Sequence, residues 1–446
     1  MAEHDPDKLP RPLISLYETI AGDEDARVCK DIPENACSAQ PTNFFVHLVS
    51  NTLSKIGDEL ASARLVLAWL LGALGAPAAF AGFLVPIRES GSLLPQLFVA
   101  AAIRRRAIRK GFWILGSLLS GLAVAGMAVV ALTLEGAAAG WAILGLLVVF
   151  ALSRGINSVA AKDVLGKTIA KHRRGTVMGY AASLAGFFTL GLGIYLTLAN
   201  LEEAGIGVFV ALLAASAGAW WIAAATFTRL REDPGATEGG GNAVTEAIKS
   251  MRLLWTDRAF GHFVLTRALL MSTALALPFY VLLAEDATAG DLGTLGLLIL
   301  ASGLASAVSA PVWGRLSDRS ARWVLILSGL LAAGLGIAVA LSVWLAPVGT
   351  DHALVPGGWV YATLFFLLGV SHAGVRLGRK TYLVDMATQE TRAAFTAVSN
   401  TVIGGLLLIG GLFGLLAQLA GTEVAIFVLA LMSLAGAVSA WLMGEA

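Results

Sequence analysis

The amino-acid sequence predicts an all-α polytopic membrane protein with twelve transmembrane helices, arranged as two pseudo-repeated halves of six helices. Composition, chain length and an internal repeat support this prediction. Apolar residues make up 57% of the 446 residues and charged residues only 14%, whereas soluble domains average roughly 45–50% and about 25%. Twelve spans of about 20 residues each would fill slightly more than half of this chain.

Composition also excludes several classes of protein. The apolar fraction is too high for a cytosolic enzyme, and 31 basic against 30 acidic residues leave no excess charge for binding nucleic acid. The apolar stretches are continuous rather than alternating, which argues against a membrane β-barrel. The sequence holds no G-x-x-x-x-G-K-[ST] motif. We therefore expect neither a nucleotide-driven pump nor an enzyme, and neither a cofactor nor a metal site.

Clusters of Gly, Pro and charged residues separate the apolar runs and set the expected spans. The spans are expected near residues 44–71, 78–102, 112–134, 137–159, 176–199, 205–228, 260–284, 292–313, 323–346, 357–377, 394–420 and 424–443.

The loop charges sort cleanly when the first apolar region is split into two spans at Gly75-Ala76-Pro77. Basic residues of short loops lie on the cytoplasmic side of a membrane. The opposite side then carries acids and no Lys or Arg. We therefore expect an even number of spans, with both termini in the cytoplasm. The acids of the opposite side are Glu135, Glu202, Glu203, Glu285, Asp286, Asp291, Asp351 and Glu423.

Two polar segments divide the chain. Residues 1–42 are mixed in charge and lack the order of a signal peptide, so we expect a cytoplasmic tail that holds Cys29 and Cys37 as reduced thiols. Residues 229–259 include Asp233-Pro234-Gly235 and Gly239-Gly240-Gly241, which predict a flexible cytoplasmic connector. The two six-helix bundles then comprise residues 43–228 and 260–446.

The two halves repeat each other weakly at a spacing of 218 residues. Ser153 aligns with Ser371, Lys162 with Lys380, and Arg174 with Arg392. The matched stretches follow the fourth and the tenth expected span, which are equivalent places in the two halves. Internal repeats of this kind are typical of secondary transporters, whose substrate path lies at the repeat interface.

The segment from Gly314 to Arg322 reads G-R-L-S-D-R-S-A-R and joins the eighth and ninth spans. It resembles the G-x-L-x-D-R-x-x-R loop motif of the major facilitator superfamily, and the resemblance covers about residues 43–443. The first half departs from the motif, because Phe98 stands where Gly314 is expected and Ala102 where Asp318 is expected. This resemblance implies the fold of that superfamily and solute transport by alternating access.

The opening of the membrane domain resembles an uncharacterised bacterial branch of the same superfamily. The segments that carry this likeness are Cys29–Pro33, Lys55–Glu59 and Val85–Ser90. The resemblance implies an integral protein of the bacterial inner membrane.

The loop motif predicts a cytoplasmic gate formed by Gly314, Asp318, Arg319 and Arg322. A carboxylate at a helix end can pair with a cation or cap a neighbouring helix, and release of that contact would separate two helices. Gly314 would allow close helix approach. The alternative is a solvated loop.

Five charged residues fall near the middle of the first two spans. They are Lys55, Asp58, Glu59, Arg88 and Glu89. Charges at that depth are costly and usually functional, and antiparallel neighbouring spans would bring these five to one level. The acids outnumber the bases, so burial and a like-charged neighbour favour uptake of a proton by one acid. Alternatives are a structural ion-pair network, or a first span that begins after Arg64.

Three further charges fall within the expected spans, and two of them, Arg154 and Arg267, lie alone in theirs. Arg64 lies on another face from the acids of its span, so we expect an isolated arginine there. Arg154 aligns with His372 in the repeat, and a histidine can titrate near neutral pH. Arg267 lies about eight residues into the seventh span, where an anionic solute, Asp58 or Glu59 would be its partner.

Taken with the resemblance, these features predict a permease: a secondary active transporter of a small molecule that uses a proton or another coupling ion. Acids in the first span favour export. Two alternatives stay open, an importer of a small anion attracted by Arg88, Arg154 and Arg267, and a non-transporting assembly or pigment-delivery protein. We expect a monomer in the lipid bilayer, without a nucleic-acid partner.

Overall fold

The computed structural model describes residues 34–445, apart from positions 97, 98, 100, 101, 104, 200–204, 236, 238–249, 346–356, 389 and 390. The side chains of residues 34–37, 172 and 393 are likewise outside the description. Several residues named above therefore lie outside it: most of the expected tail with both cysteine side chains, Phe98, the glycines at 239–241, and the acids Glu202, Glu203 and Asp351.

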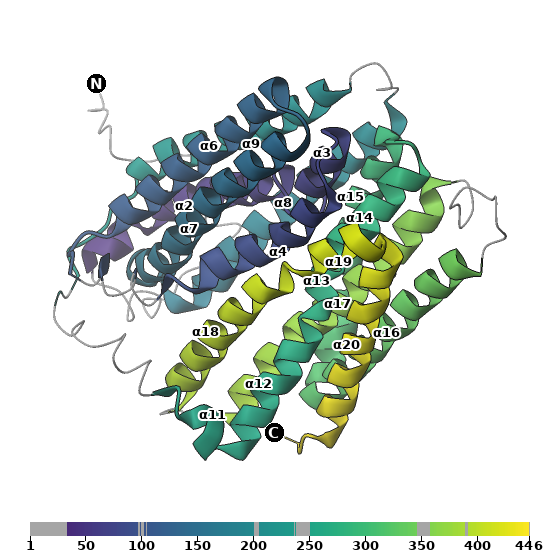
Figure 1. Cartoon of the computed structure of the whole chain (residues 1–446). Coiled ribbons are helices and arrows are strands. Elements are labelled where there is room, and N and C mark those ends of the chain that lie inside the picture. The colour runs from purple at the N-terminus through teal and green to yellow at the C-terminus, as the bar shows by residue number, and fades with distance from the viewer. Residues whose placement is uncertain are drawn as a thin grey trace.

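The described chain folds into α-helices joined by loops (Figure 1). The first half contains α2 (Glu34–Leu60), α3 (Val66–Ala73), α4 (Ala78–Leu93), α6 (Lys110–Thr133), α7 (Gly136–Thr168), α8 (Lys171–Leu198) and α9 (Ile206–Thr228). The second half contains α11 (Leu253–Thr256), α12 (Arg258–Leu270), α13 (Ser272–Leu275), α14 (Leu277–Ala287), α15 (Leu292–Ser317), α16 (Ala321–Trp344), α17 (Gly358–Met386), α18 (Arg392–Gly410), α19 (Phe413–Ala420) and α20 (Thr422–Leu442).

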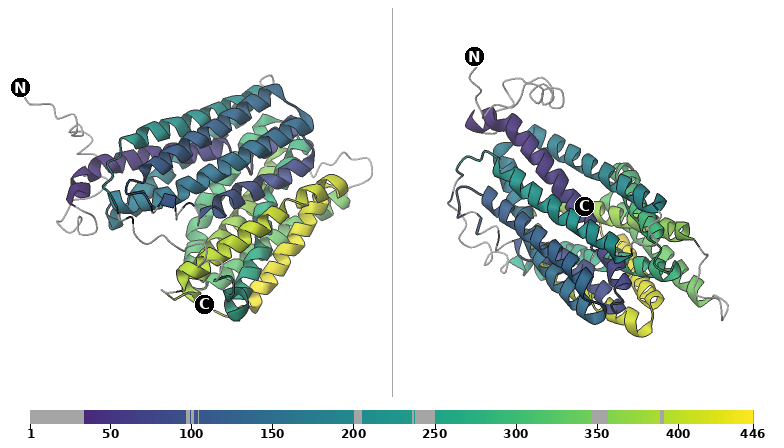
Figure 2. Two further views of the ribbon diagram at one scale, coloured as in Figure 1. Left: turned by 60° about the vertical axis from the view of Figure 1, so that its left-hand side comes forward. Right: turned by 90° about the horizontal axis from the view of Figure 1, so that it is seen from above.

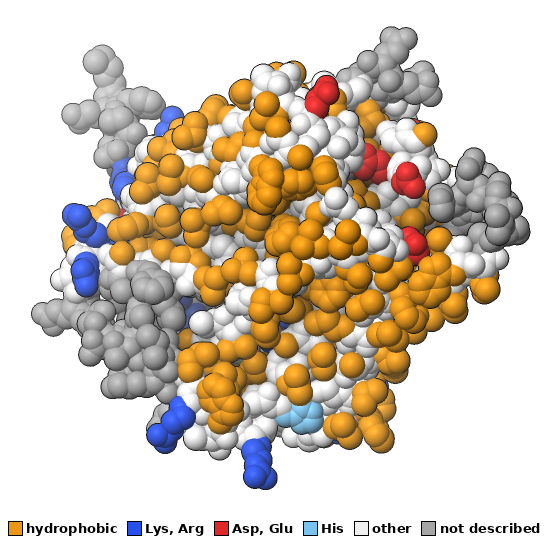
Figure 3. Space-filling view, viewed as in Figure 1, with side chains coloured by type: hydrophobic (Ala, Val, Ile, Leu, Met, Phe, Trp, Pro, Cys, Tyr) orange, Lys and Arg blue, Asp and Glu red, His pale blue; other side chains and the backbone are white. Residues whose placement is uncertain are grey.

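Ten helical segments of the described chain are long and apolar enough to cross a membrane, and they coincide with the third to twelfth expected spans. Large apolar side chains cover their outer faces, as expected for contact with lipid (Figure 3). Phe187 is 72% exposed and Leu198 is 80% exposed, for example. The prediction of a polytopic helical membrane protein is confirmed.

The first expected span is broken rather than continuous, because α2 ends at Leu60 and α3 begins at Val66. The two helices together cross the bundle. Near the start of α2, the Asn43 side chain bonds the backbone of Arg231 beyond α9. At the far end, the carbonyl of Leu74 accepts from the amide of Gly136, next to the start of α7. Broken helices of this kind border the binding sites of many transporters.

The fourth and tenth expected spans are longer helices than hydropathy indicates. Helix α7 continues to Thr168 and α17 to Met386, whereas apolar sequence ends near residues 159 and 377. These two ends are themselves 218 residues apart. As a consequence, Arg376, Arg379 and Lys380 belong to a helix and not to a loop.

Two arginines show that the halves repeat each other in detail. Arg174 donates to the carbonyls of Ile169 and Gly166 beyond the end of α7, at 2.8 and 2.6 Å. Arg392 donates to the carbonyls of Ala387 and Val384 beyond α17, at 3.5 and 3.3 Å. Each acceptor lies 218 residues from its counterpart. A cation thus caps the carbonyl end of the same helix in both halves.

The ribbons of the two halves converge at one end of the molecule and diverge toward the other (Figures 1 and 2). Glycines allow the helices to approach closely in the converging part, where Gly82 of α4 faces Gly414 of α19 and Gly296 of α15 faces Thr197 of α8. Acidic side chains lie near the converging end, and Lys and Arg lie at the diverging end (Figure 3). We call these the acidic end and the basic end.

Candidate functional site

A cavity of about 320 Å³ lies between the two halves. The first half contributes the break between α2 and α3 together with α4, and the second half contributes α14, α15 and α17. Its wall is rich in charge for a site among membrane-spanning helices. The charged residues that line it are Asp58, Glu59, Arg64, Arg88, Glu89 and Arg376.

Asp58 forms ion pairs with two arginines at once. Its two carboxylate oxygens accept from Arg88 at 2.9 Å and from Arg154 at 2.5 Å. Each guanidinium also lies over an aromatic ring, Arg88 over Phe150 and Arg154 over Trp220. The expected meeting of the first two spans therefore occurs, and it recruits the arginine of the fourth span as well. Such contacts hold α2, α4 and α7 together.

Arg64 is not isolated, contrary to the sequence prediction. Its guanidinium donates to Glu89 at 2.8 Å. An unbroken helix would have placed Arg64 on another face from the acids, but the break after Leu60 redirects the chain so that this side chain enters the cavity. The pair joins the broken first crossing to α4.

Glu59 differs from the other two acids of the cavity. Its carboxylate makes no hydrogen bond or ion pair with the described residues, although it lies in electrostatic range of Lys55, Arg64 and Arg376. Lys55 does not line the main cavity. It lines an adjoining space of about 710 Å³ between α8 and α15, which Glu59 also borders. Among the three cavity acids, Glu59 is thus the one whose carboxylate has no hydrogen-bond or ion-pair partner in the described chain.

Two charged positions of the later spans have neutral partners. Arg267 donates to the hydroxyl of Ser399 at 2.6 Å and to the side-chain oxygen of Asn400 at 2.9 Å, so the expected pairing with Asp58 or Glu59 is wrong in this conformation. His372 lines the cavity. Its Nδ1 contacts the Thr273 hydroxyl at 3.2 Å, and its buried Nε2 has no partner in the described chain.

Sequence reasoning did not place Arg376 and Arg379 in the site, because they stand at the end of the tenth expected span and just beyond it. Arg376 lines the cavity one helical turn after His372, and Arg379 lies close enough to interact with Glu89 and Arg376. His372, Arg376 and Arg379 are spaced four and three residues apart along α17, which places them on one face of the helix. A hydropathy criterion alone does not detect this pattern.

The residues of the loop motif lie at the basic end and are solvent-facing. Asp318 and Arg319 are exposed at the end of α15 and form no ion pair with described residues. Gly314 has open space where a side chain would begin, so it does not permit close helix approach in this conformation. Arg322 instead binds the carbonyl of Met443 at 2.7 Å and the carboxylate of Glu445 at 3.0 Å.

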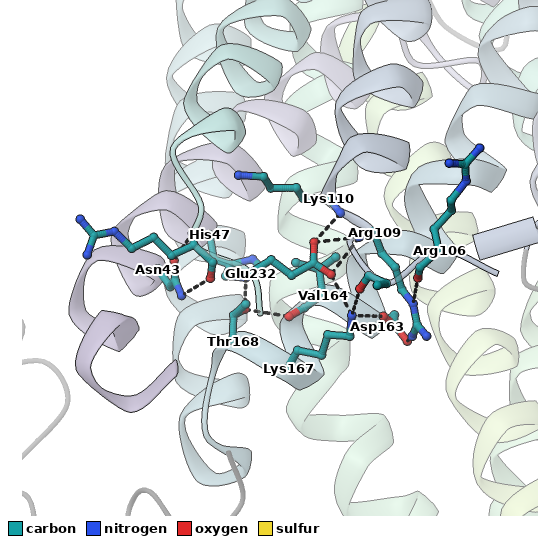
Figure 4. Close-up of polar contacts among 12 residues, drawn as sticks. Asn43, His47, Arg106, Arg109, Lys110, Asp163, Val164, Lys167, Thr168 and Glu232 are labelled. Atoms are coloured by element: carbon teal, nitrogen blue, oxygen red, sulfur yellow. Dashed lines mark hydrogen bonds and ion pairs between the residues drawn. The ribbon is translucent and has the colours of Figure 1, made fainter. Parts of the chain in front are cut away.

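The first half has a buried network at its basic end that sequence reasoning also missed (Figure 4). The carboxylate of Glu232, in the connector, is fully buried and pairs with Lys167 at 2.9 Å. It also accepts from the backbone amides of Arg109 and Lys110 at the start of α6. Asp163 pairs with Arg109 beside it. The connector is thereby fastened to the first half.

Apolar helices in two repeated halves, with a charged cavity between them, define a membrane protein with a transporter fold. The resemblance that the loop motif indicated is confirmed: residues 269–445 match the family model of the Major Facilitator Superfamily.

Solved structures of this superfamily share the fold over nearly the whole chain. The nucleoside transporter NupG is similar at a TM-score of 0.68 with 11% identity, covering 89% of this chain and 99% of its own. An inward-open structure of the xylose transporter XylE from E. coli gives a TM-score of 0.65 with 10% identity, covering 90% and 97%. A POT family transporter in complex with a peptide conjugate gives 0.66 with 12% identity, covering 92% and 98%. No curated protein matches this chain.

Proposed function

We propose that this protein is a secondary active transporter that moves a small solute through the central cavity by alternating access, coupled to protons at Glu59. The cavity carries this proposal, because charged residues of both halves line it between membrane-spanning helices. Charge in that position is expensive and marks substrate or ion pathways. A cavity shared by two repeated halves is also the place where rocking of one half against the other alternates access.

In this proposal the bundles at residues 43–228 and 260–446 move against each other, joined by the connector at residues 229–259 and preceded by the tail at residues 1–42. The basic end faces the cytoplasm of a bacterial cell, because loop Lys and Arg residues remain on that side.

Among the three cavity acids, Glu59 fits the role of proton carrier. Asp58 is held by two arginines and Glu89 by one, so protonation of either acid would break an ion pair. Glu59 has no such pair within the described residues, and its neighbour Asp58 carries the same charge. Movement of the cations around it during alternating access would change its proton affinity and drive uptake on one side and release on the other.

Reconstitution tests the proposal. The full-length protein is placed in liposomes that contain a pH-sensitive dye, and a metabolite library is screened for solutes that move protons. We expect Glu59→Gln to abolish solute-driven proton movement while solute exchange across the membrane persists. Glu135→Gln is the matched control, because that carboxylate is exposed just before α7 and far from the cavity lining.

Two results would contradict the proposal in different ways. Full proton coupling in Glu59→Gln would remove Glu59 from the mechanism. Absence of any solute movement with the wild-type protein would instead favour an assembly role for this fold. Export, which the acids of the first span favour, stays a prediction that the same liposomes test with gradients of opposite sign.

A further inference from the structure

We infer that the solute of this transporter is a small organic anion whose carboxylate or phosphate group binds Arg376. The inference rests on the proposed function and names the class of substrate for the same cavity. It derives from how the charges of the two cavity walls are partnered.

The arginines of the wall from the first half are all paired within that half. Asp58 accepts from Arg88 and Arg154, and Glu89 accepts from Arg64. These side chains already use their strongest contacts within the protein. A solute that bound Arg88 or Arg154 would have to displace Asp58, so the arginines that the sequence suggested for anion binding are poorly suited to it.

The wall from the second half carries a cation that forms no ion pair with the described residues. Arg376 lines the cavity, and its guanidinium makes no hydrogen bond there, although Glu59 and Glu89 lie in its electrostatic range. Arg379 lies close behind it and adds positive charge. A guanidinium presents paired N–H donors that match the two oxygens of a carboxylate or phosphate. Its vacant donors therefore select an oxyanion.

Excess cation extends beyond this one residue. The acids of the cavity wall are Asp58, Glu59 and Glu89, and the cations that line or immediately adjoin it are Lys55, Arg64, Arg88, Arg154, Arg376 and Arg379. When Glu59 is protonated, one more negative charge leaves the wall. Proton binding at Glu59 would then strengthen anion binding at Arg376, which couples the two ligands through charge alone.

Neutral groups of the same wall suit the remainder of a small polar solute. Ser302 and Ser306 of α15 line the cavity, as does His372, whose Nε2 has no partner in the described chain. Phe365 adds one aromatic surface. A volume of about 320 Å³ lies near the lower limit for small-molecule pockets, so the part of the solute that binds at this wall is compact.

The test uses the full-length protein in lipid nanodiscs and a deproteinised metabolite extract as the probe. Bound solutes are washed, eluted and identified by mass spectrometry for the wild type, Arg376→Gln and Arg376→Lys. Arg258→Gln serves as the control, because Arg258 is exposed at the start of α12. We expect the wild type and the control to retain a solute that is anionic at pH 7. Retention by Arg376→Gln should fall about 10- to 100-fold, as for loss of charge-assisted hydrogen bonds.

Arg376→Lys keeps the charge but not the paired donors, so intermediate retention is expected, and this variant keeps the test valid if Arg376→Gln does not fold. Carboxylates and phosphates among the retained solutes are told apart by their masses. Retention of a neutral or cationic solute, or of an anion equally by all variants, would overturn the inference and leave transport intact. A wild type that retains no solute and moves no protons would overturn the proposed function as well.

Discussion

The two halves of this protein carry similar helices but partner their charges differently. In the first half, Asp58 and Glu89 form ion pairs with three arginines inside the bundle. Among the described residues of the second half, Arg267 bonds only the neutral side chains of Ser399 and Asn400, and the guanidinium of Arg376 forms no hydrogen bond or ion pair, although Glu59 and Glu89 lie in its electrostatic range. Paired charges hold helices in place, whereas an unpaired charge next to a cavity is available to a ligand. We therefore propose that the charges of the first half mainly stabilise the helix packing and that those of the second half mainly bind the solute.

The basic ends of the halves differ in the same sense. The first half lacks the acid of the loop motif, and Glu232 of the connector occupies a buried position against the start of α6 instead. In the second half the motif acid Asp318 is present but exposed. The basic end of the first half thus holds a buried and paired carboxylate. The basic end of the second half has an exposed carboxylate, which is free to form an ion pair in another conformation.

The largest effect is expected from breaking the Asp58 centre. Asp58→Asn would leave Arg88 and Arg154 facing each other without a carboxylate, which should lower stability by about 3 kcal/mol or more. Unfolding midpoints of the purified variant in detergent measure this loss. Asp286→Asn is the matched control, since Asp286 is exposed at the acidic end. Equal midpoints for the two variants would show that the first half is not stabilised by its paired charges.

A smaller and more selective contrast is expected at the basic ends. Glu232→Gln removes a buried charge from Lys167 and two backbone amides, so it should cost about 2 kcal/mol of stability. Asp318→Asn changes an exposed side chain and should stay within about 0.5 kcal/mol of the wild type. Transport should respond in the opposite order, because we propose Asp318 as a gate residue. Thermal melts and initial transport rates measure the two quantities.

The reverse pattern would exchange the roles of the two ends. If Asp318→Asn melted early and transported normally, its carboxylate would be a structural group. The outcome for Glu232 is independent, since it belongs to another half and another network.

Hydropathy and loop charge were sufficient to predict the helical class and ten of the spans. They could not predict the break after Leu60, because no Gly or Pro lies between residues 60 and 65. Beyond the break, Arg64 meets Glu89 in a contact between separate parts of the chain. Sequence patterns describe one helix at a time, so a contact of this kind is invisible to them.

The candidate site was predicted for the first half and largely missed for the second. Asp58, Glu59, Arg88 and Glu89 attract notice because apolar sequence surrounds them. Arg376 stands at the very end of the tenth expected span, next to Arg379 and Lys380, which hydropathy leaves outside that span. Only the extension of α17 to Met386 places that run beside the cavity. Glu232 escaped notice for a similar reason, since its partners Arg109, Lys110 and Lys167 lie between 65 and 123 residues away in sequence.

The smallest expected effect concerns the two arginine caps, which compare the halves most directly. Arg174 holds its carbonyls at 2.8 and 2.6 Å, whereas the equivalent bonds of Arg392 measure 3.5 and 3.3 Å, and the one to Val384 is exposed. Shorter charge-assisted bonds are stronger, and solvent weakens the exposed ones. Arg174→Gln should therefore cost about 1 kcal/mol and Arg392→Gln roughly half of that. Melting midpoints of both variants in the same detergent give the comparison, with Arg258→Gln as the control for loss of charge alone. Equal losses of stability in the two variants would mean that bond length does not set the contribution of each cap. The first half would then not be more strongly stabilised than the second at this position.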